Sequence, residues 1–211
     1  MFADRADAGK KLAQNLSAFK KDKPVIVALP RGGVVVGYVV AKILGAPLEV
    51  LIVRKIGSPY NAEFGIGAVA EDGTVFFDTG SVRRVGLKQK DLQAAKAKEL
   101  SEIRRRKKLY AEAERADLKN KTIILIDDGI ATGGTIQVAI KSLKKQNVKK
   151  IIVAVPLASE EIADRLRKEV GEFIALFEAP DLQAVGSFFD DFTQVTDEQV
   201  MTLLKAQKGR S

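Results

Sequence analysis

The chain has 211 residues, of which 46% are hydrophobic, which suits one α/β domain with small additions. It contains neither cysteine nor histidine. Disulfides, thiolate catalysis and zinc–thiolate sites are therefore excluded, and any chemistry falls to carboxylates, amines, tyrosine and the backbone. The net charge of +8 favours polyanionic partners, either phosphorylated small molecules or nucleic acid. No apolar run reaches membrane-spanning length and no signal-peptide pattern opens the chain, so we expect a cytoplasmic protein.

Apolar periodicity predicts helices, buried strands and a β-hairpin in the first part of the chain. The expected helices are 3–20 and 34–44, the strands are 24–29 and 48–53, and the hairpin strands are 67–70 and 74–78. Arg31, Gly32 and Gly33 form the junction between the first strand and the second helix. A guanidinium and free N–H groups at such a junction can hold an anion. Arg54 and Lys55 are expected just past a parallel strand, pointing into the same crevice.

The second part of the chain alternates strands and helices. The expected strands are 123–126, 150–155 and 173–177, and the expected helices are 87–116, 134–146 and 159–170. This order predicts an α/β fold: a doubly wound, mostly parallel sheet of about five strands flanked by helices, with the β-hairpin as an insertion. We expect a single domain over residues 1–211, with its core at about 21–178. The terminal segments 1–20 and 180–211 are expected to form a small cap over the crevice.

The stretch 123–135 carries the strongest functional signal. Its first four residues are apolar and mostly β-branched, as in a strand buried on both faces, and Asp127 and Asp128 follow at the strand's end. In an open α/β sheet, ligands bind outside the carboxyl ends of the strands. The stretch is not an ATP-binding P-loop, because Thr135 stands where that motif requires lysine. A solvated acidic turn is the alternative for this stretch.

Small residues follow the two acids and lead into a helix. Gly133 and Gly134 allow the backbone to approach a ligand closely, and Thr132 and Thr135 add hydroxyl donors. Successive N–H groups at a helix N-terminus form an anion site. Beside a phosphate, the two carboxylates would have to bind hydroxyls or a divalent cation. The sequence therefore predicts a ligand with both a phosphate and a sugar, together with Mg2+.

These residues resemble the 5-phosphoribosyl diphosphate (PRPP) signature of type I phosphoribosyltransferases, in which a hydrophobic strand and two acids precede Thr-Gly-x-Thr. Residues 28–37 and 53–70 also fall in the order and spacing of that family's core. The opening Phe2-x-x-Arg5 and the segment 184–192 resemble a bacterial and archaeal group of phosphoribosyltransferases whose acceptor is generally unassigned. Regulatory proteins share the signature, so the resemblance implies the fold and the ligand more strongly than catalysis.

The resemblance implies that Mg2+-PRPP lies across three loops. The residues implied for the 5′-phosphate are Ala131, Thr132, Gly133, Gly134 and Thr135. Asp127 and Asp128 would bind the ribose hydroxyls and help to place Mg2+, directly or through water. The residues implied for pyrophosphate are Arg31, Gly32, Gly33, Arg54 and Lys55. A nucleophile, usually a ring nitrogen of a small-molecule acceptor, would displace pyrophosphate from the ribose, and the family's habit is a homodimer.

Two positions bear on the acceptor. In 6-oxopurine enzymes of the family an aspartate usually stands where this chain has Ala131, so the resemblance argues against a 6-oxopurine and favours the adenine type. In that type a loop glutamate does acid–base work. Glu63 lies in the loop 56–65, which we expect to be a mobile lid, and is the hypothetical general acid/base. A solvated loop carboxylate is the alternative for Glu63.

Other features leave alternatives open. The basic clusters at 104–108 and at lysines 141, 144, 145, 149 and 150 are expected to be solvated helix faces, and aromatic residues near them are scarce. Nucleic acid is therefore not the expected partner. Phe188, Phe189 and Phe192 are expected to pack within the cap, with stacking on an acceptor as the alternative. A PRPP-sensing regulator that binds nucleic acid, or a phosphosugar-binding module without chemistry, are the competing functions.

Overall fold

A five-stranded parallel sheet forms the centre of the protein. The computed structural model describes residues 1–110 and 116–208. The strand order is β2-β1-β6-β7-β8, and every neighbouring pair is parallel. The strands are β1 (Val25–Ala28), β2 (Leu48–Val50), β6 (Thr122–Ile126), β7 (Lys150–Ser159) and β8 (Glu172–Ala179). The predicted doubly wound sheet of about five strands is confirmed.

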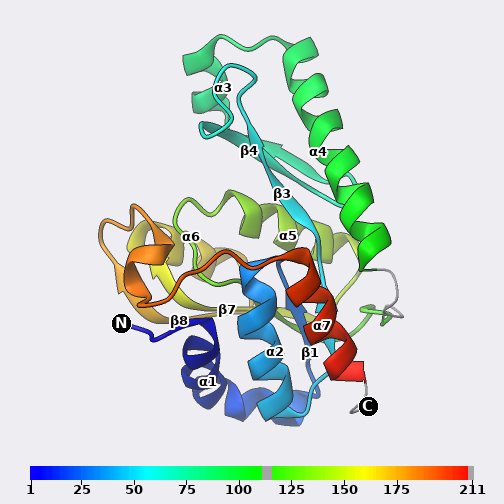
Figure 1. The fold of residues 1–211 in the computed structure, drawn as a ribbon, viewed down its shortest axis with the longest axis vertical. Coiled ribbons are helices and arrows are strands. Elements are labelled where there is room, and N and C mark those ends of the chain that lie inside the picture. The colour runs from blue at the N-terminus through cyan, green and yellow to red at the C-terminus, as the bar shows by residue number, and fades with distance from the viewer. Residues whose placement is uncertain (111–115, 209–211) are drawn as a thin grey trace.

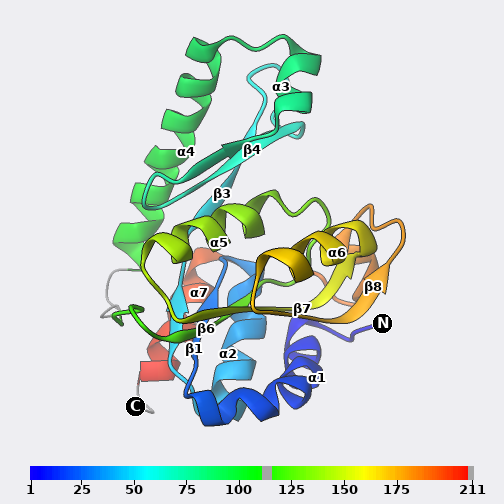
Figure 2. The same cartoon turned by 180° about the vertical axis from the view of Figure 1, so that it is seen from behind.

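Helices cover both faces of this sheet. Helices α1 (Arg5–Leu16) and α2 (Gly32–Leu44) lie on one face, and α5 (Gly134–Lys145) and α6 (Glu160–Glu169) lie on the other (Figures 1 and 2). Successive strand residues face opposite sides, so Ile124 and Ile126 join the core under α1 and α2, whereas Ile123 and Leu125 join the core under α5 and α6. All five residues of β6 are buried. Burial on both faces explains why this strand is an uninterrupted apolar run.

A second, antiparallel sheet projects beyond the first. It has the order β3-β4-β5, with β3 (Val53–Gly57), β4 (Gly65–Ala70) and β5 (Val75–Phe77). Together with α3 (Thr79–Val85) and α4 (Gln89–Leu109) it forms the arm at the top of Figures 1 and 2. The predicted hairpin is confirmed as β4 and β5.

The placement predicted for Arg54 and Lys55 is wrong. The parallel strand ends at Val50, and the two cations lie inside β3, which pairs antiparallel with β4. Val53 and Ile56 are buried while Arg54 is half-buried and Lys55 is exposed. The single apolar run at 48–53 therefore belongs to two strands of different sheets, which apolar periodicity could not separate.

Several predicted boundaries also change. The helix expected at 87–116 is preceded by α3, which ends at Gly86 with φ at 68°, and residues 111–115 of that prediction lie outside the described residues. Strand β7 continues through Pro156 to Ser159, four residues beyond its predicted end. Its register with β6 stops at Ala154. A proline is tolerated there because β6 has already ended and no ladder hydrogen bond to that side is needed.

The chain termini contribute mainly to the helical layer. Leu12 and Leu16 of α1 are fully buried and α1 packs against α2, so most of the predicted N-terminal cap covers the sheet rather than the crevice. The short helix η1 (Ser17–Asp22) follows α1. Helix α7 (Asp197–Lys208) packs on α2 and α4. Arg5, the first residue of α1, and Val185 of the segment around η2 (Val185–Phe188) reach the loop that follows β6. Among the described residues, no helix is both long and apolar enough to cross a membrane.

Candidate functional site

The candidate site lies where the order of the parallel strands reverses. After β1 the chain moves outward to β2, and it then returns to place β6 on the other side of β1. Ligands of open α/β sheets bind in the crevice at such a switch point, beyond the carboxyl ends of the strands. The turn with Arg31 follows β1, and Asp127 and Asp128 follow β6. Two stretches almost one hundred residues apart in sequence therefore meet at one crevice.

The two glycines after Arg31 touch the two acids directly. A Cβ on Gly32 would lie 1.9 Å from Oδ2 of Asp128, and a Cβ on Gly33 would lie 2.9 Å from the Cα of Asp127. Both distances are far below van der Waals contact. The glycines are thus required by the close approach of the first turn of α2 to the acidic loop.

The acid pair places two carboxyl groups side by side. The backbone N–H of Asp128 donates to Oδ1 of Asp127 at 2.9 Å, and Nε of Arg5 donates to Oδ2 of Asp128 at 2.7 Å. Burial and the neighbouring charge of Asp128 raise the pKa of Asp127 well above its usual range. Because Arg5 pairs with only one of the two carboxyl groups, a further cation bound at the pair would favour the ionised form of Asp127.

Arg5 joins both chain termini to this acid pair. It is only 9% exposed, its Nη1 donates to the carbonyl of Thr193 at 2.9 Å, and its guanidinium stacks 3.7 Å from the centre of the Phe192 ring. Phe189 packs between Phe2 and Phe192 at ring-centre distances of 5.2 and 4.9 Å. Phe189 and Phe192 are thus held by packing and by the Arg5 contact.

The loop after the acid pair is fixed to β7 and opens α5. Ile130 forms a bridge with Ala158, and the hydroxyl of Ser159 donates to the carbonyl of Ala131 at 3.1 Å. Ser159 is also the N-cap of α6, where its side chain accepts a hydrogen bond from the N–H of Ile162. Gly133 has φ at 73° and forms the N-cap of α5. Within the described residues, the N–H groups of 131–136 donate to no backbone carbonyl, so they remain available to a ligand.

A cavity of about 320 Å³ lies beside this loop. Its lining includes Thr132, Gly134, Thr135, Lys55 and Arg165. With its amide oriented to satisfy both groups, the side-chain oxygen of Gln137 accepts hydrogen bonds from Nε and Nη2 of Arg165, both at 2.9 Å. The sequence analysis missed Arg165. It stands in the second turn of α6, and the available signal was that this helix begins at the same edge of the sheet.

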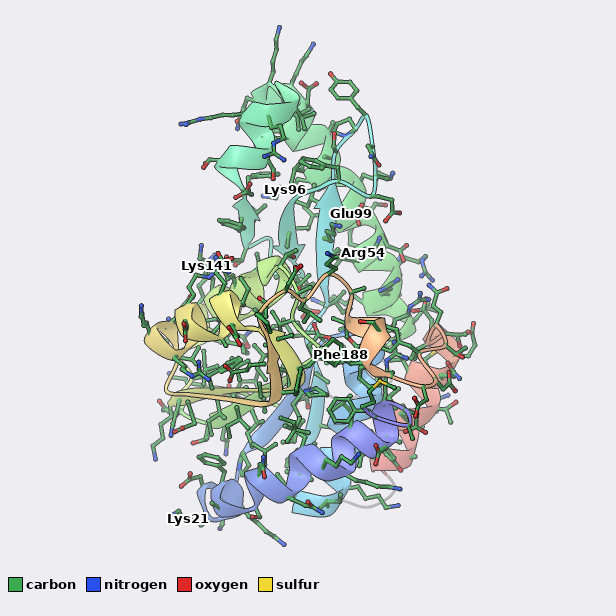
Figure 3. All side chains as sticks on the ribbon, turned by 90° about the vertical axis from the view of Figure 1, so that its left-hand side faces the viewer. Lys21, Arg54, Lys96, Glu99, Lys141 and Phe188 are labelled. Carbon is green, nitrogen blue, oxygen red and sulfur yellow. The ribbon has the colours of Figure 1, made fainter. Side chains whose placement is uncertain are left out.

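A larger cavity of about 760 Å³ lies between the turn after β1, strand β3 and helix α4. The predicted residues that line it are Arg54, Lys55, Glu63 and Thr135. Nε of Arg54 donates to Glu99 of α4 at 2.8 Å, and Figure 3 shows these two side chains next to each other. Nζ of Lys55 donates to the carbonyl of Glu63 at 2.9 Å. The structure therefore gathers all four predicted residues around one space.

The loop that connects β3 and β4 borders this larger cavity. The N–H of Ser58 donates to the carbonyl of Phe64 at 2.8 Å, and the N–H of Phe64 donates to that of Asn61 at 3.0 Å. Gly57 lies against the loop, since a Cβ there would be 2.2 Å from the carbonyl oxygen of Ala62. The Glu63 residue is exposed. The loop is therefore internally bonded while Glu63 remains accessible to a ligand.

At the candidate site, Asp127 and Asp128 are the carboxylates that could hold a metal ion. The described residues contain no group of three or more Asp, Glu, His or Cys residues arranged to hold a metal. Mg2+ commonly binds through one or two carboxylates and completes its shell with substrate phosphates and water. The donor set of Asp127 and Asp128 fits a magnesium ion that arrives with a phosphorylated ligand.

A parallel sheet whose switch point joins two carboxylates to two glycine-rich turns has the features of a protein that binds phosphorylated ligands. The chain belongs to the phosphoribosyl transferase domain family, because residues 3–178 match the sequence model of that family. The predicted resemblance is thereby confirmed.

Individual relatives agree with this assignment. A Mycobacterium tuberculosis protein provisionally named a phosphoribosyl transferase is 37% identical over 205 residues, which are 97% of this chain and 46% of the relative. The chain thus spans about half the length of that curated relative. The crystal structure of the protein TT1426 from Thermus thermophilus is 38% identical, with a TM-score of 0.80 and 98% of both chains covered. Purine phosphoribosyltransferase from Pyrococcus horikoshii shares the fold, with 19% identity, a TM-score of 0.50, and 91% and 93% of the chains covered.

Proposed function

We propose that this protein transfers 5-phosphoribose from Mg2+-PRPP to a small-molecule nucleophile and releases pyrophosphate. The observation that carries the proposal is the contact of Gly32 and Gly33 with Asp128 and Asp127 in a chain of this family. It brings an anion-binding turn and a hydroxyl-binding acid pair to one point. A donor with a sugar between two phosphate groups needs both.

The two cavities suit the two ends of such a donor. Lys55 and Thr135 line both, so the smaller and the larger cavity adjoin at these residues. In the proposal, the 5′-phosphate binds the free N–H groups and hydroxyls of residues 131–135, with Arg165 nearby. The pyrophosphate binds in the larger cavity, beside the turn with Arg31 and beside Arg54.

In the proposal, the acid pair binds the ribose and the metal. Asp127 and Asp128 accept hydrogen bonds from the ribose hydroxyls and hold Mg2+, directly or through water. When bound, Mg2+ neutralises charge on the pyrophosphate oxygens. Arg5 keeps the Asp128 carboxylate in place through its 2.7 Å contact. Bound Mg2+ would also favour the ionised form of Asp127.

The proposed reaction forms no covalent bond between the protein and the substrate. The bond from the anomeric carbon to a pyrophosphate oxygen breaks, its electrons leave with pyrophosphate, and a bond from the acceptor nitrogen to that carbon forms through an oxocarbenium-like transition state. The protein positions the two reactants, stabilises the developing charge on pyrophosphate, and excludes water when the loop over Glu63 closes.

We propose an adenine-like nucleobase as the acceptor and Glu63 as its general acid/base. Ala131 supports the first point, since it stands where 6-oxopurine enzymes of the resembled family have an aspartate. The place of Glu63 in the lining of the larger cavity supports the second. The competing function, a regulator that binds PRPP without chemistry, predicts donor binding without pyrophosphate release.

Pyrophosphate release tests this function. With Mg2+-PRPP and a panel of nucleobases, adenine first, we expect release by the wild type. The Glu63→Gln variant is expected to lower kcat by about 10²- to 10⁴-fold, the usual contribution of a general acid or base, with little change in the KM for PRPP. Glu161→Gln is the matched control, because Glu161 is an exposed carboxylate in the first turn of α6.

Two outcomes would count against the proposal. Unchanged turnover of Glu63→Gln would remove Glu63 from the mechanism. Tight PRPP binding by the wild type without pyrophosphate release for any base would favour the regulator, and a steep salt dependence of binding to DNA or RNA would then support a nucleic-acid partner.

A further inference from the structure

Helix α4 buries one arginine against the larger cavity. The buried residues of α4 are Leu92, Ile103 and Arg106, and Arg106 is only 6% exposed. The sequence predicted a solvated basic run at 104–108, and for Arg106 that prediction is wrong. Its neighbours at 104, 105, 107 and 108 are exposed. Helical periodicity explains the difference, since Arg106 follows Ile103 by one turn on the inward face.

Arg106 faces the space that the proposed function gives to pyrophosphate. It lines the 760 Å³ cavity together with Pro30, which precedes the anion-binding turn, and Arg54 of β3. The positive charges of Arg106 and Arg31 both act on the hydroxyl of Tyr110 and oppose the rise in its pKa that burial causes. Arg106 and the arginine of the turn therefore both lie near Tyr110, and Arg106 lines the cavity together with Pro30, the residue before Arg31.

The surrounding contacts hold Arg106 in place. Its Nε lies 3.0 Å from Oε1 of Glu102 and 3.8 Å from Oδ1 of Asp197. Asp197 also accepts a hydrogen bond of 2.6 Å from the Tyr110 hydroxyl, which fixes the carboxylate between α4 and α7. Both of these ion pairs involve Nε. The fork of the guanidinium is thus oriented before any ligand arrives.

The cavity as a whole favours an anion. Its lining holds four cationic side chains and two carboxylates. The cations are Arg54, Lys55, Lys98 and Arg106, and the carboxylates are Glu63 and Glu99. Of these cations, Arg106 is the one that is buried. A hydrogen bond from a guanidinium to a phosphate is stronger in a site from which water is excluded.

We propose that Arg106 is a binding residue for the pyrophosphate group of PRPP, supplied by the projecting arm rather than by the parallel sheet. The inference rests on the proposed function. Its guanidinium binds phosphate oxygens in the cavity that Pro30 and the turn after it border, and the pairs with Glu102 and Asp197 keep it oriented there. The developing negative charge on the leaving pyrophosphate is then stabilised both by the turn with Arg31 and by Arg106 of the arm.

Arg105 provides a matched control. Its side chain pairs with the same two carboxylates, at 2.8 Å to Glu102 and 2.7 Å to Asp197, but it is exposed and does not belong to the cavity lining. If Arg106 served only to join α4 to α7 through these carboxylates, Arg105→Gln would have a comparable effect. A role in binding pyrophosphate predicts an effect of Arg106→Gln alone.

The test is calorimetric binding of three probes: Mg2+-PRPP, Mg2+-pyrophosphate and ribose 5-phosphate. We expect Arg106→Gln to weaken the first two by about 10- to 100-fold, the loss of charge-assisted hydrogen bonds, and to leave ribose 5-phosphate within about twofold. Arg106→Lys keeps the charge but not the fork, so we expect an intermediate loss. It also serves as the test variant if Arg106→Gln does not fold. Arg105→Gln is expected to bind all three probes like the wild type.

The outcomes separate this inference from the proposed function. No binding of PRPP by the folded wild type would overturn the proposed function itself. Binding by the wild type that Arg106→Gln leaves unchanged would overturn only the role of Arg106. Equal losses for all three probes, or an equal effect of Arg105→Gln, would show that Arg106 acts through the joint of α4 and α7.

Discussion

Replacing Gly32 with alanine is expected to weaken the binding of Mg2+-PRPP by about 10²-fold while the protein still folds. The added methyl would lie 1.9 Å from Oδ2 of Asp128 and 2.7 Å from Nε of Arg5, so it must displace one or both. Overpacking of this kind destabilises proteins by about 1–3 kcal/mol. Binding is expected to weaken by about 10²-fold, the usual cost of a misplacement of about 1 Å in a catalytic constellation. Calorimetric titration with Mg2+-PRPP and thermal unfolding measure the two effects.

Gly80 provides the control for this substitution. It lies in α3 on the projecting arm, and a Cβ there would meet its nearest neighbour, Oδ1 of Asp78, at an ordinary 3.5 Å. Gly80→Ala is therefore expected to change neither binding nor stability noticeably. A Gly32→Ala protein that binds Mg2+-PRPP with wild-type affinity would contradict the proposed close contact between the anion-binding turn and the acid pair.

Replacing Arg5 with glutamine is expected to destabilise the folded protein by about 3–5 kcal/mol, the cost of breaking a buried ion pair. The change removes the contact with Asp128, the hydrogen bond to the carbonyl of Thr193 and the stacking on Phe192. It also leaves the Asp128 carboxylate beside Asp127 without a compensating charge. For a chain of this size the midpoint of thermal unfolding is expected to fall by roughly 6–20 °C.

A double-mutant cycle tests whether the loss of stability in Arg5→Gln comes from the unpaired carboxylate of Asp128. With Asp128→Asn added, the unpaired carboxylate is gone, so we expect part of the stability lost in Arg5→Gln to return. Lys11→Gln, on the same helix, is the control: Lys11 pairs with Asp7 at the surface, where an ion pair contributes less than about 1 kcal/mol. Additive effects of Arg5→Gln and Asp128→Asn would contradict a direct stabilising role of this pair.

Most of the central sheet and the position of the acid pair could be predicted from the sequence. The run 123–126 predicted a strand buried on both faces, and the rule that ligands bind beyond the ends of parallel strands predicted the meeting of Asp127 with the turn after β1. Both inferences need only local pattern and topology. For the same reason they could not show which glycine lies against which acid.

The residues that were missed or misplaced depend on tertiary packing. Arg54 and Lys55 were misplaced because the chain leaves one sheet and enters another within a single apolar run. The opening segment with Arg5 was part of the predicted family resemblance, but its contact with Asp128 was not predicted, because the two residues are 123 positions apart. Arg106 lies in a run of basic residues and differs from its exposed neighbours only in being on the buried side of the helix. Pairing across such separations requires the folded structure.

The most direct test of the central claim is calorimetric binding of PRPP with and without Mg2+, by the wild type and by the Asp127→Asn, Asp128→Asn double variant. The account predicts binding by the wild type that requires the metal, and loss of that binding in a double variant that remains folded. Such a result would establish the donor site on which the proposed transfer and the role of Arg106 depend. Absence of binding by folded wild-type protein, or metal-dependent binding that the double variant retains, would contradict it.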